Sequence, residues 1–271
     1  MMMERIGESG IDRAPRCEML ATKAMSASSP HISVIVVCKN PGIRLHATLE
    51  SVWSQQGVSA ELVVVDGAST DGTVPWLESR RDRMATLISE PDQGVYDAMN
   101  KGVSAARGQW LFFLGSDDRL ATSSVLAEVA ALLSQTPNAV VSGEARFDDG
   151  RLYPFAGSAA AIRRNFVHHQ ATFYRRELFT RHGHFDTSLR IQADYEHNLR
   201  LLRAGESFQS MTLLIAKCAS GGLSDSGSWA NYREEITARH RHFPAWRCWL
   251  WDIISVVRYL RKRIMRSLAS N

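Results

Sequence analysis

Residues Ser89 to Asp118 read SEPDQGVYDAMNKGVSAARGQWLFFLGSDD, a helix pattern followed by a strand pattern and two carboxylates. Apolar residues recur at helical spacing through residues 94–106, and the apolar run WLFFL at 110–114 is typical of a strand buried on both faces. Asp117 and Asp118 come directly after that strand. Ligands of open α/β sheets bind at the carboxyl ends of the strands, so this pair indicates a divalent cation that holds a phosphorylated ligand.

The same alternation of strand and helix patterns continues on both sides of this stretch. Strand patterns at 32–37, 61–65 and 85–89 precede it, separated by helix patterns at 44–55 and 74–81. This β-α-β order predicts an α/β fold, Rossmann-like, with a mostly parallel central sheet flanked by helices. Further along the chain we expect helices at 122–135, 194–203, 229–242 and 244–268, and strands at 139–147, 151–155, 170–174 and 208–216.

The composition is that of an ordinary globular protein, with 271 residues, 45% of them hydrophobic and 22% charged, and a net charge of +4. We interpret residues 1–30 as a disordered tail and residues 31–228 as the main domain, with halves at 31–120 and 121–228; residues 229–271 form a helical extension. The four cysteines form no CxxC motif, which argues against a zinc site and favours reduced thiols in the cytoplasm. The sequence contains no uninterrupted apolar stretch of ~18 residues, so we expect no membrane-spanning helix.

Two more carboxylates at the starts and ends of elements are candidates for chemistry. Asp66 ends the strand pattern within VVVDGASTDGT, where it either accepts hydrogen bonds from a base or ribose or, like Asp71, caps a turn. Asp194 begins the helix pattern at 194–203, either as a general base in a cleft or as an acidic residue favoured by the helix dipole. Asp117 and Asp118 also have a purely structural alternative, in which they form a turn and cap the N-terminus of the next helix. The residues alone leave these alternatives open.

Taken together, the segments resemble family 2 glycosyltransferases of the GT-A fold over about residues 32–224. The matching segments are, in chain order, VIVVCKN, LESVWSQ, VVVDGASTDGT, SEPDQGVYDAMNKG, FLGSDD, HHQATFYRR and QADYEHNLRLL. Each segment is a weak match alone, but their order and spacing together are highly specific. The resemblance is to bacterial enzymes that build exopolysaccharide, O-antigen or glycolipid sugars.

The resemblance implies a role for each matching position. Asp194 is the implied catalytic base, and Asp117 and Asp118 are the implied ligands of a Mg²⁺ or Mn²⁺ cofactor. The implied nucleotide-sugar-binding residues are Val37, Cys38, Asn40, Asp66, Glu90, Asp92, Tyr96, Asn100, Lys101, Ser116 and Asp117. His169, Gln170 and Glu196 are the expected contacts of the acceptor or the sugar.

Two positions depart from the family pattern. Gly115 stands where the family's Asp-x-Asp triplet has its first aspartate, so the expected metal site rests on Asp117 and Asp118, with Asp117 as the favoured ligand. In addition, residues 192–194 read Gln-Ala-Asp, which supplies one carboxylate where many relatives have Glu-Asp.

The implied reaction is the inverting transfer of a sugar from a nucleotide diphosphate sugar to an acceptor hydroxyl. A UDP-sugar is the favoured donor. A lipid-linked saccharide in cell-surface polysaccharide synthesis is the expected acceptor. Two alternatives stay open: a catalytically inactive nucleotide-sugar-binding protein of the same fold, and a nucleotidyltransferase. The second lacks support because CKNPGIR, after the first strand, is not a glycine-rich phosphate loop.

The last helix pattern is amphipathic and basic. Its apolar face carries Trp249, Ile253, Val256, Leu260, Ile264 and Leu268, while Arg247, Asp252, Arg258, Arg261, Lys262 and Arg266 lie towards the other face. Such a helix suits a membrane surface rich in anionic lipid, and the alternative is ordinary packing on the domain or a dimer partner. We therefore expect a peripheral protein at the inner face of the cytoplasmic membrane. We expect no nucleic-acid partner, because the basic residues cluster on this one helix.

Overall fold

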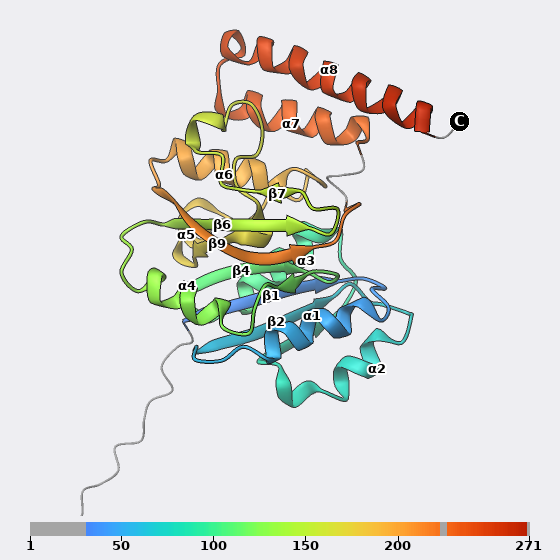
Figure 1. The fold of residues 1–271 in the computed structure, drawn as a ribbon, viewed down its shortest axis with the longest axis vertical. Helices are drawn as coiled ribbons and strands as arrows, with labels where there is room; N and C mark the ends of the chain where they lie inside the picture. Colours follow the sequence, from blue (N-terminus) through green and yellow to red (C-terminus); the bar gives the residue numbers. More distant parts are fainter. Residues whose placement is uncertain (1–30, 223–226, 270–271) are drawn as a thin grey trace, which may run out of the picture.

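The computed structural model describes residues 31–222 and 227–269, so the predicted tail at 1–30 and part of the loop after residue 220 lie outside the described residues. The described chain builds one central sheet with helices on both faces (Figure 1). The strands lie in the order β3 (Thr86–Ser89), β2 (Ala60–Asp66), β1 (Ile32–Cys38), β4 (Trp110–Gly115), β8 (Thr172–Arg175), β6 (Val140–Phe147), β9 (Phe208–Cys218) and β5 (Arg119–Leu120), and β7 (Leu152–Tyr153) pairs with β6. Most of the paired residues lie in parallel ladders, which confirms the predicted α/β class.

The first half of the sheet is parallel throughout. It consists of β1 (Ile32–Cys38), β2 (Ala60–Asp66), β3 (Thr86–Ser89) and β4 (Trp110–Gly115). All residues of β1 are buried, because its side chains alternate between two hydrophobic cores on opposite faces of the sheet. The helices α1 (Arg44–Trp53) and α2 (Thr73–Glu78) cover one face, and α3 (Val95–Ala105) covers the other.

The second half of the sheet is mixed. Here β8 (Thr172–Arg175) runs antiparallel to both of its neighbours, β4 and β6 (Val140–Phe147). The remaining elements are β5 (Arg119–Leu120), α4 (Val125–Leu133), β7 (Leu152–Tyr153), α5 (Glu177–His182), α6 (Ala193–Arg203) and β9 (Phe208–Cys218). The strand expected at 170–174 starts later, at Thr172, because residues His169–Ala171 form a 3₁₀ turn.

Two helices at the end of the described chain form an outer layer. Figure 1 shows α7 (Trp229–His242) lying over α6, and α8 (Ala245–Ala269) lying over α7. The boundaries of both helices agree with the sequence patterns to within one residue. None of the described helices is long and apolar enough to cross a membrane.

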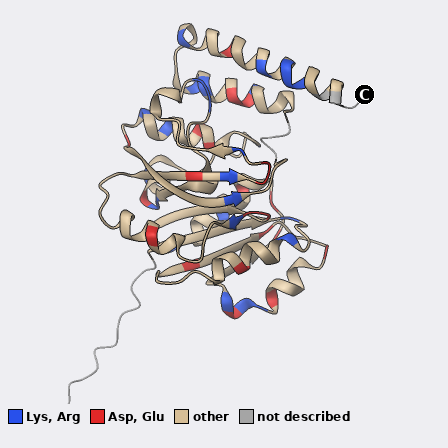
Figure 2. Ribbon diagram, viewed as in Figure 1, with Lys and Arg blue, Asp and Glu red and all other residues tan. Residues whose placement is uncertain are grey.

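Parallel register brings several chemically active residues to one edge of the sheet. Cys38 at the end of β1 pairs with Asp66 at the end of β2, and Val37 pairs with Gly115 at the end of β4. The loops that follow these strands therefore emerge side by side. Figure 2 shows acidic and basic residues gathered at the edge where the strand arrows end.

Candidate active site

A cavity of about 780 Å³ opens along this edge of the sheet. The strand ends form its floor, and residues from α3, α6, α7 and α8 complete its walls. Many of the residues predicted from the sequence line it: Val37, Cys38, Asp92, Tyr96, Ser116, Asp117, Asp118, His169, Gln170 and Asp194. The fold thus brings together carboxylates that lie far apart in the chain.

The two adjacent carboxylates after β4 differ in environment. The Asp117 side chain is 39% exposed, and its Oδ2 lies 3.7 Å from Arg44 Nη1. Asp118 is buried and accepts hydrogen bonds from the Gln170 amide and from the backbone N–H of Ala219, at 2.9 Å in the second case. Burial, helped by the charge of Asp117, raises the pKa of Asp118 to about 6 against the opposing hydrogen bond from Ala219. Asp117 is therefore the carboxylate presented to a ligand in the cavity.

Steric crowding explains why position 115, shortly before this pair, is a glycine. A Cβ atom at position 115 would collide with the carboxylate of Asp118 and would crowd the amide of Gln170. Because the Asp118–Gln170 hydrogen bond occupies that space, an aspartate does not fit at this position without rearrangement. The departure from the Asp-x-Asp pattern is thus linked to the inward orientation of Asp118.

These carboxylates suit a divalent cation that is shared with a ligand. Mg²⁺ takes oxygen ligands and usually binds proteins through one or two carboxylates together with substrate phosphates. In the part of the chain that the structure describes, no group of three or more His, Cys, Asp or Glu side chains could enclose a metal ion. Asp117 and Asp118 are the carboxylates after β4 that could contribute oxygen ligands to such an ion.

Asp194 lies at the start of α6, inside a shell of hydrogen-bond donors. Its Oδ1 accepts from the Tyr195 N–H at 2.8 Å and lies 2.9 Å from the Tyr96 hydroxyl oxygen. Its Oδ2 lies 2.9 Å from Asn165 Nδ2 and 3.1 Å from His169 Nδ1. Burial raises the pKa of Asp194, but the hydrogen bond and charge of His169 and the bonds from both tyrosines outweigh it, so the pKa lies below its usual range. Asp194 is held as an anion.

Residues 33–197 match the model of the family described as glycosyl transferase family 2. The chain belongs to this family. A PGL/p-HBAD biosynthesis glycosyltransferase of Mycobacterium bovis is 37% identical over 188 residues, covering 64% of this chain and 70% of the relative. The succinoglycan biosynthesis protein ExoO of Rhizobium meliloti is 32% identical over 187 residues, covering 61% of this chain and 54% of the relative.

Solved structures show the same fold. S. aureus TarS 1-349 in complex with UDP-GlcNAc superposes with a TM-score of 0.65 at 19% identity, covering 78% of this chain and 66% of that chain. The mannosyltransferase PcManGT of Pyrobaculum calidifontis, in complex with GDP-Man and Mn²⁺, gives a TM-score of 0.56 at 21% identity, covering 88% of this chain and 65% of that chain. The predicted GT-A fold is confirmed, and about a third of each solved chain has no counterpart in the match.

Several residues of the predicted set lie outside the cavity of this family 2 chain, where each has a structural partner. The buried Asp66 carboxylate accepts from Ser69 N–H and Ser89 Oγ, both at 2.9 Å, which ties the ends of β2 and β3 together. Asn40 accepts from Thr70 N–H at 2.8 Å. A contact of Asp66 with the nucleotide stays a prediction.

The helix α3 also divides its predicted residues between cavity and scaffold. Lys101 binds Glu90 at 2.9 Å and the Pro91 carbonyl at 2.7 Å, while Asn100 exchanges two hydrogen bonds with the backbone of Phe185. Of the side chains on this helix that were predicted to bind the nucleotide sugar, only Tyr96 lines the cavity. Glu196, on α6, is likewise turned away, towards Arg200 at 3.1 Å and His242 at 2.9 Å.

Other cavity residues were missed by the sequence patterns. Asn165 donates to Asp194, and Arg164, Arg258 and Lys262 line the same cavity. Asn165 stands just before the FVHHQ segment, which was a weak signal in the sequence. The sequence pattern places Arg258 and Lys262 on the basic side of an amphipathic helix, but no periodicity reveals which side of a helix faces a cleft.

Proposed function

We propose that this protein is an inverting glycosyltransferase that moves a sugar from a nucleotide diphosphate sugar, a UDP-sugar in the first place, to an acceptor hydroxyl. The observation that carries the proposal is the joint lining of one cavity by Asp117 after β4 and Asp194 on α6. One carboxylate suits the leaving diphosphate, and the other suits the attacking hydroxyl. The UDP-GlcNAc bound by TarS supports the choice of a UDP-sugar for the first tests.

Asp194 is the proposed general base. The single hydrogen of the Tyr96 hydroxyl lies within reach of the Ile191 carbonyl at 2.8 Å and of Asp194 Oδ1 at 2.9 Å. When Tyr96 donates to Ile191, a lone pair of Oδ1 is available for the acceptor hydroxyl. The acceptor oxygen attacks the anomeric carbon as its proton moves to Asp194, and the bond between that carbon and the diphosphate oxygen breaks with its electron pair on the diphosphate. A single displacement from the opposite face inverts the anomeric configuration.

Asp117 and Asp118 are the proposed ligands of the cofactor. A bound Mg²⁺ or Mn²⁺ ion would supply Lewis-acid stabilisation of the charge that develops on the departing diphosphate. Asp117 offers its half-exposed carboxylate to the cavity, while Asp118 stays fixed by Gln170 and Ala219. The Mn²⁺ bound with GDP-Man in PcManGT supports the test of this ion.

Asp117→Asn is expected to weaken Mn²⁺-dependent UDP binding by at least about 10- to 100-fold, the range seen when even supporting partners of metal ligands are removed. The amide keeps the shape of the side chain but loses the charge that attracts the ion. Titration calorimetry with UDP, with and without Mn²⁺, measures the effect. Asp82→Asn, an equal charge change in an exposed turn, is the control and should bind UDP as the wild type does. Equal Mn²⁺ enhancement in both variants would contradict the metal role.

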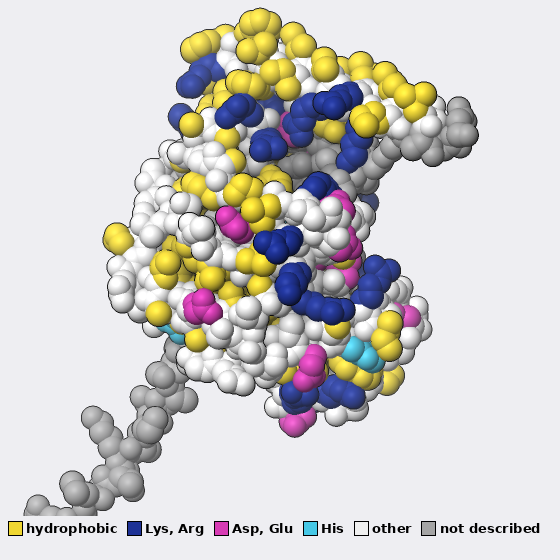
Figure 3. All heavy atoms as spheres, viewed as in Figure 1, with side chains coloured by type: hydrophobic (Ala, Val, Ile, Leu, Met, Phe, Trp, Pro, Cys, Tyr) yellow, Lys and Arg dark blue, Asp and Glu magenta, His cyan; other side chains and the backbone are white. Residues whose placement is uncertain are grey.

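We further propose that α8 places the enzyme on an anionic membrane surface, where a lipid-linked saccharide would be the acceptor. The outer face of α8 carries exposed apolar side chains: Trp246, Trp249, Leu250, Ile253, Val257, Leu260, Ile264, Met265 and Leu268. We call this set the apolar stripe. Figure 3 shows hydrophobic side chains along the outer edge of this layer and basic side chains beneath them. Interfacial helices combine these two features.

Ile253→Asn together with Ile264→Asn should reduce binding to vesicles of phosphatidylglycerol and phosphatidylcholine by about 100-fold or more, because each change removes ~1.5–3 kcal/mol of apolar burial in the interface. Both side chains are more than half exposed, so the fold should tolerate the changes. Sedimentation with the vesicles measures binding, and Ile43→Asn, an exposed isoleucine before α1, is the control. A stable dimer that the same pair of changes dissolves, without vesicle binding, would assign the stripe to a second copy of the chain.

A further inference from the structure

A cluster of cations lines the part of the cavity under α8. Arg164 comes from the loop before Asn165, and Arg258 and Lys262 come from α8, one helical turn apart. We call these three residues the cationic wall. Glu235 is the one carboxylate that the described parts of α7 and α8 present to the cavity. Figure 3 shows basic side chains beneath the α7–α8 layer, facing the hollow of the molecule.

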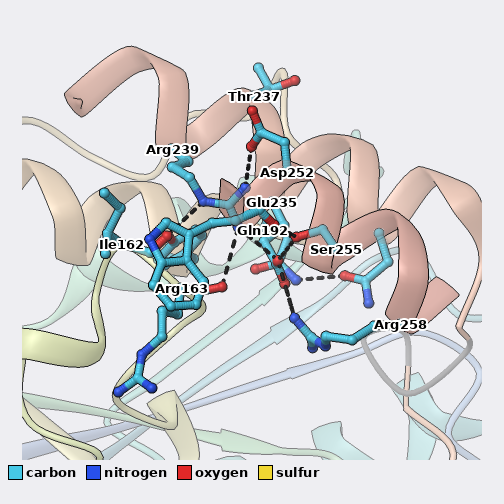
Figure 4. A network of polar contacts seen from close by, with 12 residues as sticks. Ile162, Arg163, Gln192, Glu235, Thr237, Arg239, Asp252, Ser255 and Arg258 are labelled. Carbon is cyan, nitrogen blue, oxygen red and sulfur yellow. Dashed lines mark hydrogen bonds and ion pairs between the residues drawn. The ribbon is translucent and has the colours of Figure 1, made fainter. Parts of the chain in front are cut away.

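One buried arginine holds the two parts of this wall together. Arg239 of α7 is fully buried and donates to the carbonyl oxygens of Ile162 and Arg163, at 2.6 Å and 3.2 Å, directly before Arg164. Its guanidinium also binds Glu235 at 2.9 Å and Ser255 Oγ of α8 at 3.2 Å. Figure 4 shows this network, in which Arg258 approaches Glu235 from α8.

The network leaves a surplus of positive charge on the wall. Arg239 pairs with both Glu235 and Asp252, and Arg258 shares Glu235 at 3.3 Å, so these two cations and two carboxylates balance one another. Arg164 adds a further charge and lies with its guanidinium 6.0 Å from the centre of the Tyr153 ring. A surplus of cations in a partly enclosed cavity favours an anionic ligand, because low-dielectric walls focus the field.

The wall lies close to the proposed base. The Tyr153 hydroxyl donates to the Asn165 carbonyl at 3.0 Å, and Asn165 Nδ2 donates to Asp194 at 2.9 Å. Tyr153 thus connects the part of the cavity that carries Arg164 to Asn165 and Asp194. A ligand held by the wall therefore has its anionic group near the position where an acceptor hydroxyl would meet Asp194.

We propose that the cationic wall is a binding site for the phosphate or diphosphate of the acceptor, so that the acceptor is a short glycan on a phosphate-linked lipid. The inference rests on the proposed function and deepens it. Arginine forks and a lysine ammonium are the side chains that bind phosphate oxygens, through charge-assisted hydrogen bonds. The same helix turns the apolar stripe outwards, which would place a lipid chain at the membrane while its phosphate meets Arg258 and Lys262.

The test compares two double variants at neighbouring positions. One changes two cations that line the cavity, and the other changes the adjacent cations that do not. Arg164→Gln with Lys262→Gln removes two charges from the wall. Arg163→Gln with Arg261→Gln removes the same charge from adjacent positions outside the cavity lining. Farnesyl diphosphate is the probe, with UDP and Mn²⁺ at saturation so that the donor site is filled. Titration calorimetry gives the affinity, and the thermal transition of each variant checks its fold.

The wall variant should bind farnesyl diphosphate at least about tenfold more weakly than the wild type, and the control should stay within about twofold. Arg164→Lys, which keeps the charge, should recover part of the affinity and guards against a folding artefact. Farnesol should bind much more weakly than farnesyl diphosphate. If inorganic pyrophosphate binds as tightly as farnesyl diphosphate, and the wall variant loses this binding, the phosphate site would stand but the lipid-linked acceptor would be overturned.

Three results would overturn the site: equal weakening in the two double variants, equal binding of farnesol, or no binding of farnesyl diphosphate when UDP and Mn²⁺ fill the donor site. Vesicles of phosphatidylglycerol provide a further check, because a general membrane attraction would weaken equally in both double variants. The proposed function is tested separately by UDP binding in the absence of lipid. A chain that binds farnesyl diphosphate through the wall but does not bind UDP and Mn²⁺ would keep the anion site and lose the transferase assignment.

Discussion

Asp194→Asn is expected to lower kcat by ~10²–10⁴-fold while leaving the affinity for UDP and Mn²⁺ close to that of the wild type. The amide cannot take the acceptor proton, yet it can keep much of the surrounding hydrogen bonding. Its oxygen can still accept from Tyr195 N–H, and its NH₂ group can donate to His169 once that ring adopts the other tautomer. Turnover with a UDP-sugar screen and calorimetry with UDP separate the chemical step from donor binding.

The control for this variant is Asp186→Asn, which removes a carboxylate that pairs with Arg241 outside the cavity lining. It should retain kcat within about twofold. The pKa of Asp194 is lowered, so the base stays ionised above its usual pKa near 4 and its protonation should not limit kcat between pH 5 and 8. A wild-type rate in the asparagine variant would remove Asp194 as the base. The same large loss in His169→Gln, with a shifted pH profile, would show that the proton leaves through the imidazole.

Arg239→Met is expected to lower the free energy of unfolding by ~3–5 kcal/mol, because it leaves buried carboxylates and carbonyl groups without their partner. Arg239 has no exposed side-chain surface and binds Glu235, Asp252, Ser255 and two loop carbonyls. Methionine fills much of the same volume, so the loss measures polar contacts more than packing. Urea unfolding at pH 7, followed by circular dichroism, gives the value.

Arg241→Met, two residues further along α7, is the matched control for this measurement. Arg241 pairs with Asp186 at the surface, where both side chains are more than a third exposed. An exposed pair of this kind contributes ~0–1 kcal/mol. Equal losses in the two variants would show that the buried network contributes no more than a surface pair, and that α8 is held mainly by its apolar contacts.

The sequence determined the first half of the fold because its signals are local and consistent. Continuous apolar runs such as residues 110–114 require burial on both faces, and the helix patterns between them force parallel connections. Aspartates at the carboxyl ends of these strands then fall at one edge of the sheet. This placement makes Asp117 a candidate, whereas Asp194, at the start of a helix, becomes one only through the family resemblance.

Only the tertiary structure decided which of two adjacent or nearby polar residues faces the cavity. Asp118 turns inward to Gln170 and Ala219, whereas Asp117 stays exposed. The sequence favours Asp117 as the metal ligand but shows nothing of this difference in burial. Long-range hydrogen bonds, such as those from Asn165 and Tyr96 to Asp194, leave no periodic signal in the chain. These contacts depend on how loops from distant segments meet.

The amphipathic pattern of α8 determined that this helix has an apolar face and a basic side, but not what either one meets. The structure packs the helix on α7 with the apolar stripe outwards, and it turns Arg258 and Lys262 into the cavity that holds Asp194. A hydrophobic period shows which residues share one face of a helix, but it does not show which neighbour that face meets. The neighbour on each side is set by the position of the whole helix, and here Arg239 of α7 contacts Asp252 and Ser255 of α8.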